Sequence, residues 1–308
     1  MQKKFLLRLI IFCGKILIVI VDIYCLVGGS KMKIACLGPR GTFSHIVLQN
    51  YMSGKGEYSE HLFPDFQSLT DAVKSSEADI AVCPVENSQE GAVNQITEAL
   101  ALDGGIFMNG EYLQKVSQCL LAPIDSNSAD IKIIFSNPQA VGQCRNYLGS
   151  KFPGVEYSYT DSTAAAAEAA LANGLNSGVV GSEKLRSLYP LTLIEEDIQD
   201  NKSNFTRFAV ISKNPEISEN GDKTSIAFGV KHEPGGLNKI LSVFDVFGIN
   251  MLKIESHPSK ISAGEYIFLA DFEGNCMTKN VSLALKIIKK KAKYYKLIGC
   301  YKSFRLPE

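Results

Sequence analysis

The sequence has few of the residues from which metal sites and disulfide frameworks are built. Its 308 residues include only four histidines, far apart in the chain, and eight cysteines, none in a Cys-x-x-Cys pair. A zinc site needs several such ligands close together, and a disulfide framework is typical of small, cysteine-dense domains. We therefore expect no metal site and no cofactor site, and reduced thiols of the kind found in cytoplasmic proteins.

The sequence also lacks a net charge. Lys and Arg together number 32, as do Asp and Glu. Without an excess of basic residues there is no electrostatic argument for nucleic acid as a partner. Hydrophobic residues make up 45% and charged residues 21%, a composition typical of a soluble globular protein. The chain is long enough for two domains or more.

The apolar N-terminal stretch, residues 1–29, lacks the long uncharged run of a membrane span. Arg8, Lys15 and Asp22 interrupt it, whereas a span needs about 20 predominantly apolar residues. Three interpretations stay open: residues 1–31 are not part of the native protein, which then starts at Met32; they are a weak anchor or targeting segment; or they are a cleaved signal peptide. We favour the first and expect no stable membrane insertion.

From residue 33 onward, short apolar runs alternate with helical patterns, which indicates α/β layers with a largely parallel sheet. Residues 214–223 are polar, contain Pro and Gly, and are typical of a linker. The strand–helix–strand–strand–helix–strand order that follows predicts a ferredoxin-like domain. The expected strands are 33–37, 80–84, 116–122, 131–136, 155–160, 178–181, 205–212, 224–231, 250–257, 265–272 and 294–302, and the expected helices are 42–51, 66–75, 89–102, 138–148, 162–171, 235–247 and 278–291.

The segment Asn204–Phe208 (Asn-Phe-Thr-Arg-Phe) places a hydroxyl beside a guanidinium. Arg207 can hold a carboxylate with two parallel hydrogen bonds, and Thr206 can donate one bond to a nearby oxygen. An ordinary strand with one exposed arginine is the competing interpretation. In a strand the two side chains point to opposite faces, so we favour Thr206 as the functional one.

Taken in order with Asn204–Phe208, four other segments resemble the motifs of prephenate dehydratases. The likeness runs from about residue 34 to 211, and a second likeness, to the regulatory ACT domain, from about 224 to 303. It implies a two-lobed, periplasmic-binding-protein-like catalytic domain at 32–212, a linker at 213–223 and a ferredoxin-like ACT domain at 224–304. The four segments are Gly38–Ser44, Pro84–Gly91, Ser136–Cys144, and Ser162-Thr163 with the four alanines that follow.

The resemblance implies the decarboxylating dehydration of prephenate to phenylpyruvate, a step toward L-phenylalanine, by a cytoplasmic homo-oligomer (dimer or tetramer) without a cofactor. It gives catalytic roles to Thr206, Glu86 and Asn87, with Thr206 donating to the departing oxygen. Helix capping competes as an interpretation of several motif residues. The substrate-binding residues that it implies are Thr42, Ser44, Ser136, Gln143, Ser162, Thr163 and Arg207.

Three positions depart from the family pattern. Asn137 stands where histidine is common before Pro-Gln, and a carboxamide cannot relay protons near neutrality. Gly236 and His257 replace an alanine and an arginine in the two motifs that resemble an L-phenylalanine site. The effector-binding residues implied are Gly235, Gly236, Leu237, Asn250, Glu255 and Ser256.

Two other functions remain as alternatives to prephenate dehydration. An arogenate dehydratase performs the same elimination on a substrate with an amino group in place of the keto group. A non-catalytic sensor could use the same two-lobed scaffold to bind a ligand. In the C-terminal domain, a purely structural dimerisation module is the alternative to an effector site.

Overall fold

The computed structural model describes residues 10–12, 15–17, 31–259 and 265–303. The chain divides into two compact units, residues 1–31 and 32–308. In the first unit β1 (Ile10–Phe12) pairs antiparallel with β2 (Lys15–Leu17); the rest of the expected N-terminal extension, up to residue 30, lies outside the described residues. None of the helices in the described part combines the length and the apolar composition that a membrane span needs.

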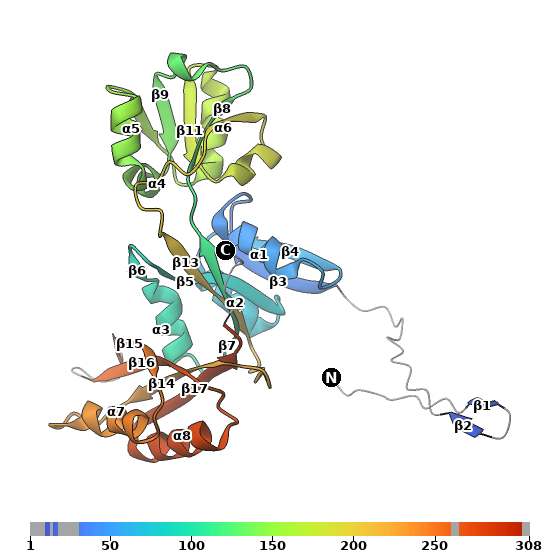
Figure 1. The fold of residues 1–308 in the computed structure, drawn as a ribbon, viewed down its shortest axis with the longest axis vertical. Coiled ribbons are helices and arrows are strands. Elements are labelled where there is room, and N and C mark those ends of the chain that lie inside the picture. The colour runs from blue at the N-terminus through green and yellow to red at the C-terminus, as the bar shows by residue number, and fades with distance from the viewer. Residues whose placement is uncertain (1–9, 13–14, 18–30, 260–264, 304–308) are drawn as a thin grey trace. The chain divides into compact units, whose positions relative to one another are not determined.

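The first lobe of the second unit is built on a sheet with the strand order β4-β3-β5-β13-β7, in which β6 also pairs with β5 (Figure 1). β3 runs parallel to β4 and β5, whereas β13 runs antiparallel to both β5 and β7. The sheet is therefore mixed rather than largely parallel. Its elements are β3 (Met32–Leu37), α1 (Phe43–Met52), β4 (Tyr58–Phe63), α2 (Phe66–Ser75), β5 (Ile80–Asn87), β6 (Gly91–Ala92), α3 (Asn94–Leu102), β7 (Phe107–Lys115) and β13 (Phe205–Ser212).

The second lobe carries a five-stranded sheet of order β10-β9-β11-β8-β12, parallel at one edge and antiparallel at the other. The chain enters it after β7 and returns to the first lobe at β13, so two crossover segments join the lobes (Figure 1). Its elements are β8 (Cys119–Pro123), the 3-10 helix η1 (Ser128–Asp130), β9 (Ile133–Ser136), α4 (Pro138–Gln143), α5 (Arg145–Lys151), β10 (Glu156–Tyr159), α6 (Thr163–Asn173), β11 (Ser177–Gly181), the 3-10 helix η2 (Glu183–Ser187) and β12 (Leu191–Glu195).

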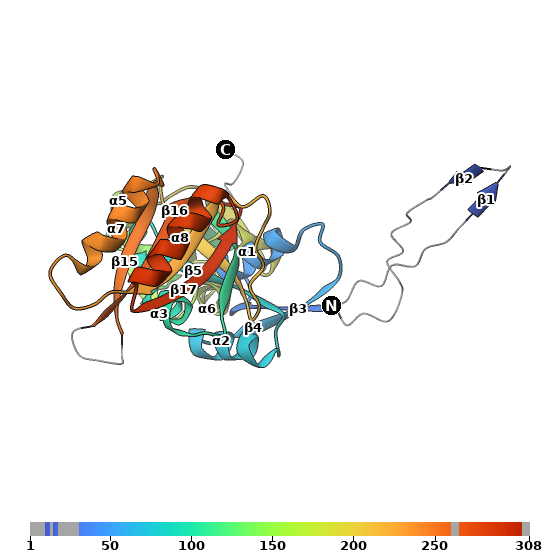
Figure 2. The ribbon, with the colours of Figure 1, turned by 90° about the horizontal axis from the view of Figure 1, so that it is seen from below.

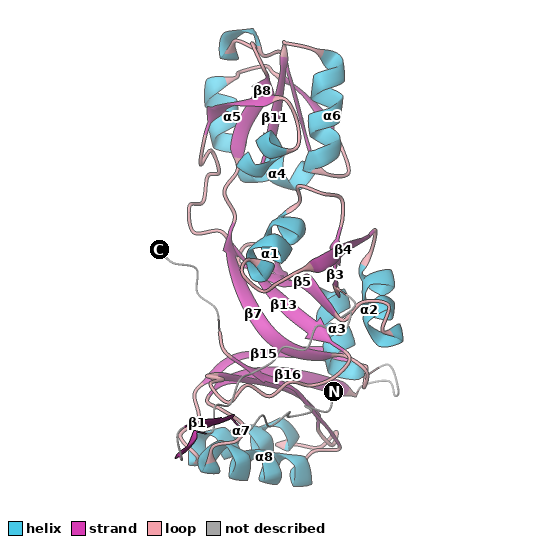
Figure 3. Ribbon diagram, turned by 90° about the vertical axis from the view of Figure 1, so that its right-hand side faces the viewer, coloured by secondary structure: helices cyan, strands magenta, loops and turns pink. Residues whose placement is uncertain are grey.

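The C-terminal sheet has the order β15-β16-β14-β17, with all pairs antiparallel. Helices α7 and α8 cover one of its faces (Figures 2 and 3). The split βαβ order predicted from the sequence is confirmed. The elements are β14 (Lys223–Gly229), α7 (Gly236–Val246), β15 (Met251–Pro258), β16 (Tyr266–Glu273), α8 (Lys279–Lys291) and β17 (Tyr294–Tyr301).

Both faces of the C-terminal sheet are buried, and strand alternation divides its side chains between two cores. Ile226 and Phe228 pack under α7 and α8, whereas Ala227 joins the core of the first lobe together with Ile96 and Leu100 of α3. The Lys296 ammonium extends this contact, because it donates to the carbonyls of Leu100 and Ile106 at 2.7 and 2.8 Å, beside the end of α3. The C-terminal sheet therefore rests directly on the first lobe.

Two expected helices differ from the structure for local reasons. The helix expected at 89–102 begins only at Asn94, because Gly91, at a φ of 83°, turns the chain into the short strand β6. The helix expected at 138–148 is divided at Cys144. There the carbonyl of Gln143 accepts from the backbone N–H of Asp200 (2.7 Å) instead of continuing the helical ladder.

Candidate active site

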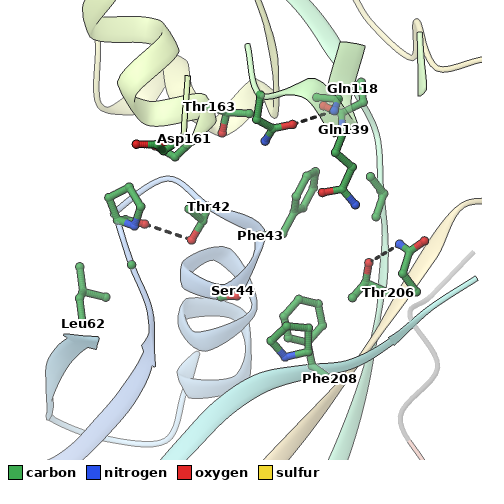
Figure 4. Close-up of a pocket in the computed structure, with 18 of the residues that line it drawn as sticks. Thr42, Phe43, Ser44, Leu62, Gln118, Gln139, Asp161, Thr163, Thr206 and Phe208 are labelled. Atoms are coloured by element: carbon green, nitrogen blue, oxygen red, sulfur yellow. Dashed lines mark hydrogen bonds between the residues drawn. The ribbon is translucent and has the colours of Figure 1, made fainter. Parts of the chain in front are cut away.

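A cavity of about 750 Å³ lies where the two lobes face one another. Polar side chains from both lobes and from a crossover segment reach it (Figure 4). Asp161 is the one ionisable residue in its lining. The lining consists of Gly38, Pro39, Thr42, Phe43, Ser44, Leu62, Phe63, Pro64, Pro84, Asn87, Val116, Gln118, Asn137, Gln139, Ala140, Gln143, Asp161, Ser162, Thr163, Thr206 and Phe208.

On the first lobe the cavity is bounded by the turn at residues 38–44, which leads into α1. Thr42 caps this helix: its hydroxyl accepts from the N–H of His45 (3.4 Å) and donates to the carbonyl of Pro39 (3.0 Å). Gly41 has a φ of 87°, and a Cβ there would lie 2.9 Å from Leu188 of the second lobe. The glycine therefore lets the two lobes approach, and the N-terminus of α1 brings backbone N–H groups to the cavity.

The buried ring of His45 supports this turn. Its Nδ1 accepts from the N–H of Gly41 (3.2 Å), and its Nε2 lies 3.2 Å from the carboxylate of Glu60. Because Nδ1 is the acceptor, Nε2 carries the proton that faces Glu60. The histidine thus acts on the backbone of the turn and is not part of the cavity lining.

Thr206 and Asn87 form the polar pair on the sheet side of the cavity. They are cross-strand partners on β13 and β5, and Asn87 Nδ2 donates to Thr206 Oγ1 at 2.9 Å (Figure 4). A hydroxyl that accepts on one side keeps its own proton for another partner. Thr206 is therefore arranged to donate into the cavity.

The second lobe contributes amides and hydroxyls at helix starts. Asn137 Oδ1 caps α4 by accepting from Ala140 N–H (2.7 Å), and Ser162 Oγ caps α6 by accepting from Ala165 N–H (3.1 Å). Both residues line the cavity, so capping and lining coexist at these positions. The carboxamide that replaces the usual histidine at position 137 serves as a helix cap.

Gln118 and Gln143 form a second amide pair in the lining. Gln143 Oε1 accepts from Gln118 Nε2 at 3.1 Å, which leaves the Gln143 amide nitrogen as a free donor in this pair. Gln118 lies on a crossover segment whose backbone is tied to the other one, because its N–H donates to Gln199 Oε1 (2.9 Å) and its carbonyl accepts from the N–H of Ile198 (2.8 Å). Gln118 therefore takes part both in the contact between the two crossover segments and in the cavity lining.

Seven of the ten expected catalytic and substrate-binding residues line this cavity, and three do not. Ser136 is fully buried and donates to the carbonyl of Val180 (2.7 Å), a contact within the second sheet. Glu86 and Arg207 lie on the other side of their strands. The seven in the lining are Thr42, Ser44, Asn87, Gln143, Ser162, Thr163 and Thr206.

In place of the expected substrate contact, Arg207 makes ion pairs toward the C-terminal sheet. Its side chain is 11% exposed; Nε donates to Glu111 at 2.5 Å and Nη1 lies 2.7 Å from Asp271 of β16. Nη2 donates to the hydroxyl of Tyr301 (3.0 Å). Burial alone would lower the pKa of Arg207, but Tyr301, Asp271 and Glu111 together raise it well above its usual value. Its guanidinium is thus committed to an internal salt bridge.

Glu86 belongs to the same charged region. Its carboxylate lies 2.7 Å from Lys253 Nζ on β15 and 3.7 Å from Arg207. Lys253 also contacts Glu255 at 3.0 Å, and Lys223 contacts Glu111 at 2.8 Å. We call this group the junction cluster: Glu86, Glu111, Arg207, Lys223, Lys253 and Asp271.

Sequence reasoning missed several lining residues. Phe208 could have been found, because it lies two residues after Thr206 and alternate side chains of a strand share a face. Gln139 lies inside a quoted motif, next to Pro138. Asp161 precedes the Ser-Thr motif, and Gln118 lies in a crossover segment that carries no local pattern of its own.

The C-terminal domain has a second cavity, of about 270 Å³, at the start of α7. Gly235, Gly236 and Leu237 line it, whereas Asn250, Glu255 and Ser256 are not in its lining. A Cβ on Gly236 would lie 2.6 Å from the carbonyl oxygen of Lys231, so this backbone has no room for the alanine of the family motif. Burial raises the pKa of Glu255, but the neighbouring His257 and Lys253 outweigh that effect and lower it.

A cysteine adjacent to a lining residue is buried and outside the cavity lining. Cys144 follows Gln143 and is fully buried, and burial raises its pKa to about 12. All six cysteines in the described part of the chain are free thiols. Among the same residues no group of three His, Cys, Asp or Glu side chains is placed to share a metal ion.

Comparison with known proteins identifies the family. The prephenate dehydratase family model matches residues 34–216. The bifunctional chorismate mutase/prephenate dehydratase of Aquifex aeolicus is 38% identical over 286 residues, which span 92% of this chain and 77% of that protein. The prephenate dehydratase of Lactococcus lactis is 34% identical over 283 residues, or 90% of this chain and all of the relative.

A solved structure has the same fold. The crystal structure of prephenate dehydratase from Arthrobacter aurescens, in complex with L-Phe, superposes with a TM-score of 0.80 at 28% identity and covers 88% of this chain and 90% of that one. The expected two-lobed, periplasmic-binding-protein-like architecture is thereby confirmed. With the family model covering more than half of its length, the chain belongs to the prephenate dehydratase family.

Proposed function

We propose that the protein is a hydro-lyase that converts prephenate to phenylpyruvate, carbon dioxide and water in L-phenylalanine biosynthesis. The observation that carries this proposal is the hydroxyl of Thr206, which accepts from Asn87 and is left to donate into a cavity lined by both lobes. In the reaction the ring C–O and ring C–carboxylate bonds break. The electron pair released by decarboxylation completes the aromatic ring, and the departing hydroxide takes up a proton from solvent to become water.

In this mechanism Thr206 donates a hydrogen bond to the departing oxygen as negative charge develops on it. A free hydroxyl is a weak acid, so its contribution is electrostatic stabilisation rather than complete proton transfer. Asn87 raises that contribution, because its N–H bond to Oγ1 polarises the hydroxyl and fixes its direction.

The two carboxylates of the substrate require donors. We assign this role to neutral groups: the backbone N–H groups at the start of α1, the hydroxyls of Ser44 and Thr163, and the free amide nitrogen of Gln143. Thr42 and Ser162 position these helix starts as caps. Phe43 and Phe208 supply apolar surface for the ring, which becomes aromatic as the reaction proceeds.

Regulation is assigned to the C-terminal domain. We propose that residues 32–212 are the catalytic domain, 213–223 the linker and 224–304 an ACT domain that binds L-phenylalanine at the cavity beside Gly235–Leu237. The structure of the Arthrobacter aurescens relative in complex with L-Phe supports L-phenylalanine as the ligand. We also propose a homo-oligomer, dimer or tetramer, acting in the cytoplasm, where the free thiols stay reduced.

Thr206→Val tests the catalytic assignment, because valine keeps the shape of threonine and removes the hydroxyl. Without this donor we expect kcat to fall by about 10²- to 10³-fold with KM changed little. Thr206→Ser, which keeps the hydroxyl, is the matched control. A purified wild-type protein that binds prephenate without turnover would support the sensor alternative. A greater kcat/KM on arogenate than on prephenate would show that arogenate is the preferred substrate.

A further inference from the structure

Asn204 is a fully buried polar residue, 0% exposed, that the mechanism above does not use. It lies immediately before β13, two residues from Thr206, and is not in the cavity lining. Its side-chain Oδ1 accepts from Asn87 Nδ2 at 3.1 Å and from the Ser88 hydroxyl at 3.4 Å. Its side chain therefore contacts Asn87, which is also the hydrogen-bond partner of the proposed catalytic hydroxyl of Thr206.

The orientation of the Asn87 amide depends on four hydrogen bonds. Its Oδ1 accepts from the backbone N–H groups of Gln89 (2.9 Å) and Glu90 (3.2 Å). A carboxamide nitrogen carries two hydrogens, and here one lies toward Asn204 Oδ1 and the other toward Thr206 Oγ1. With all four bonds made, both the side on which the nitrogen lies and the plane of the amide are fixed.

A purely structural role would leave Asn204 with both ends of its amide satisfied, as is usual for buried side chains. Instead its Nδ2 has no hydrogen-bond partner in the described part of the chain. Its backbone carbonyl, which accepts from the N–H of Val116 at 2.8 Å, would be available from any residue at this position. The hydrogen bonds that the side chain makes within the protein are therefore those of its oxygen, which accepts from Asn87 and Ser88.

We propose that Asn204 is a positioning residue for the dehydration. By holding one hydrogen of the Asn87 amide, it keeps the other on the oxygen of Thr206, so that the proton of the threonine hydroxyl is directed to the substrate. Asn204 itself does not touch the substrate. The proposal rests on the proposed function, since it assigns to Asn204 an effect that passes through Asn87 to Thr206.

Two consequences follow from this geometry. Loss of the Asn204 acceptor lowers kcat rather than raising KM, because the residue does not line the cavity. The loss also depends on the hydroxyl at 206, because a residue that acts through another has no further effect once that other is removed. A merely structural asparagine would show neither pattern.

Asn204→Ala, Asn204→Asp and Thr206→Val, alone and combined, test the proposal in the full-length protein with prephenate. Removing the acceptor with Asn204→Ala should lower kcat about tenfold, since small misplacements of catalytic groups have effects of this order or larger, with KM within about twofold. Asn204→Asp retains an acceptor oxygen and should keep more of the activity than the alanine variant. In the Thr206→Val background, Asn204→Ala should leave the residual rate unchanged within about twofold.

Asn109→Ala is the matched control. Asn109 makes comparable bonds, donating to Ser212 Oγ (2.7 Å) and the carbonyl of Asn214 (3.1 Å), but it is not in the cavity lining. Its loss should leave kcat within about twofold of wild type, since it has no route to Thr206. Thermal unfolding of each variant separates an effect on stability from one on turnover.

Several outcomes would overturn the proposal. An equal loss of rate in the wild-type and Thr206→Val backgrounds would show that Asn204 acts independently of the hydroxyl, and a rise in KM at constant kcat would make it part of substrate binding. If the alanine variant does not fold, a folded Asn204→Asp variant as slow as Thr206→Val contradicts the acceptor role. A wild-type protein without turnover of prephenate or arogenate defeats the proposed function itself, whereas normal activity of Asn204→Ala defeats only the positioning role.

Discussion

Thr206 and Arg207 are neighbours on β13, and their side chains lie in opposite electrostatic environments. Thr206 faces a cavity lined by hydroxyls, amides and apolar groups, in which Asp161 is the one ionisable residue. Arg207 faces the junction cluster, where charged side chains of the first lobe meet those of the C-terminal sheet at 2.7–2.8 Å. The strand therefore separates a cavity with a single ionisable residue in its lining from a cluster of ion pairs between domains.

This separation suits the chemistry. The ring carboxylate of prephenate loses its charge as carbon dioxide departs, so a cation held against it would stabilise the reactant more than the transition state. Neutral donors bind the anion without that penalty to the rate. The basic side chains that the cavity lining lacks lie on the opposite face of β13 and β5, where Arg207 and Lys253 join the C-terminal sheet to the strands that carry Thr206 and Asn87.

Removal of the guanidinium at the centre of the junction cluster should give the largest effect on stability. Arg207→Met leaves Glu111 and Asp271, both nearly fully buried, without this partner. Lys223 remains near both carboxylates, but removing one partner of a buried ion pair costs about 3–5 kcal/mol, which urea unfolding would measure. Arg186→Met, which removes an exposed pair with Glu183, should cost about 1 kcal/mol or less. Equal losses for the two variants would contradict the role of the cluster.

The same strand shows how far the sequence can predict the site. The five ordered motifs led, through their resemblance to a known family, to the fold and to seven cavity residues. Three of the motifs lie where a strand ends and a helix begins, a position that local sequence specifies. Arg207 could not be placed in the same way. Period two only shows that it faces away from Thr206, and its partners Asp271 and Tyr301 lie in a different domain.

The helices and strands also differ in how well local sequence predicts them. The helix at 66–75 and the strand at 205–212 were predicted with the observed bounds, because apolar spacing and capping residues define them locally. Strands β4, β7 and β12 were not predicted. Their residues are largely half-buried and mixed in polarity, so pairing with neighbours distant in the sequence determines them.

The docking of the C-terminal sheet should also depend on Gly299. A Cβ at this position would lie 1.9 Å from the carbonyl oxygen of Met108 on β7. Gly299→Ala should therefore force β17 away from β7 and destabilise the protein by about 1–3 kcal/mol, the usual cost of overpacking. Gly149→Ala, in α5 with no atom near the new methyl group, is the control and should be neutral or slightly stabilising, since alanine favours helix. Urea unfolding monitored for both variants would detect the difference, and an unchanged midpoint for Gly299→Ala would exclude this close approach.

Lys253 offers a way to separate regulation from turnover. It bridges Glu86, next to Asn87, and Glu255 of the motif that resembles an effector site. If this bridge transmits the effector signal, Lys253→Met should raise the phenylalanine concentration for half-inhibition by about tenfold, within the range of allosteric coupling energies, and change turnover without phenylalanine much less. Lys74→Met, which removes ion pairs with Asp71 and Asp103 outside the junction cluster, should leave inhibition unchanged. Identical inhibition curves for Lys253→Met and wild type would show that the ion pairs of Lys253 do not transmit the effector signal.

The smallest expected effect concerns the single carboxylate of the cavity. Asp161 is exposed, and its repulsion of a dianionic substrate in a wet site amounts to about 1 kcal/mol or less. Asp161→Asn should accordingly lower KM for prephenate about two- to threefold, by the same Coulomb estimate, with kcat nearly constant, while Asp130→Asn, outside the cavity, should change neither. Steady-state kinetics at low and high salt provide the measurement, because screening should reduce the difference between the variant and wild type.

For arogenate, whose side chain carries an ammonium, the same substitution should raise KM instead. A carboxylate that disfavours the keto acid and favours the amino acid would then set the balance between the two substrates, in a cavity that otherwise has no charge with which to distinguish them.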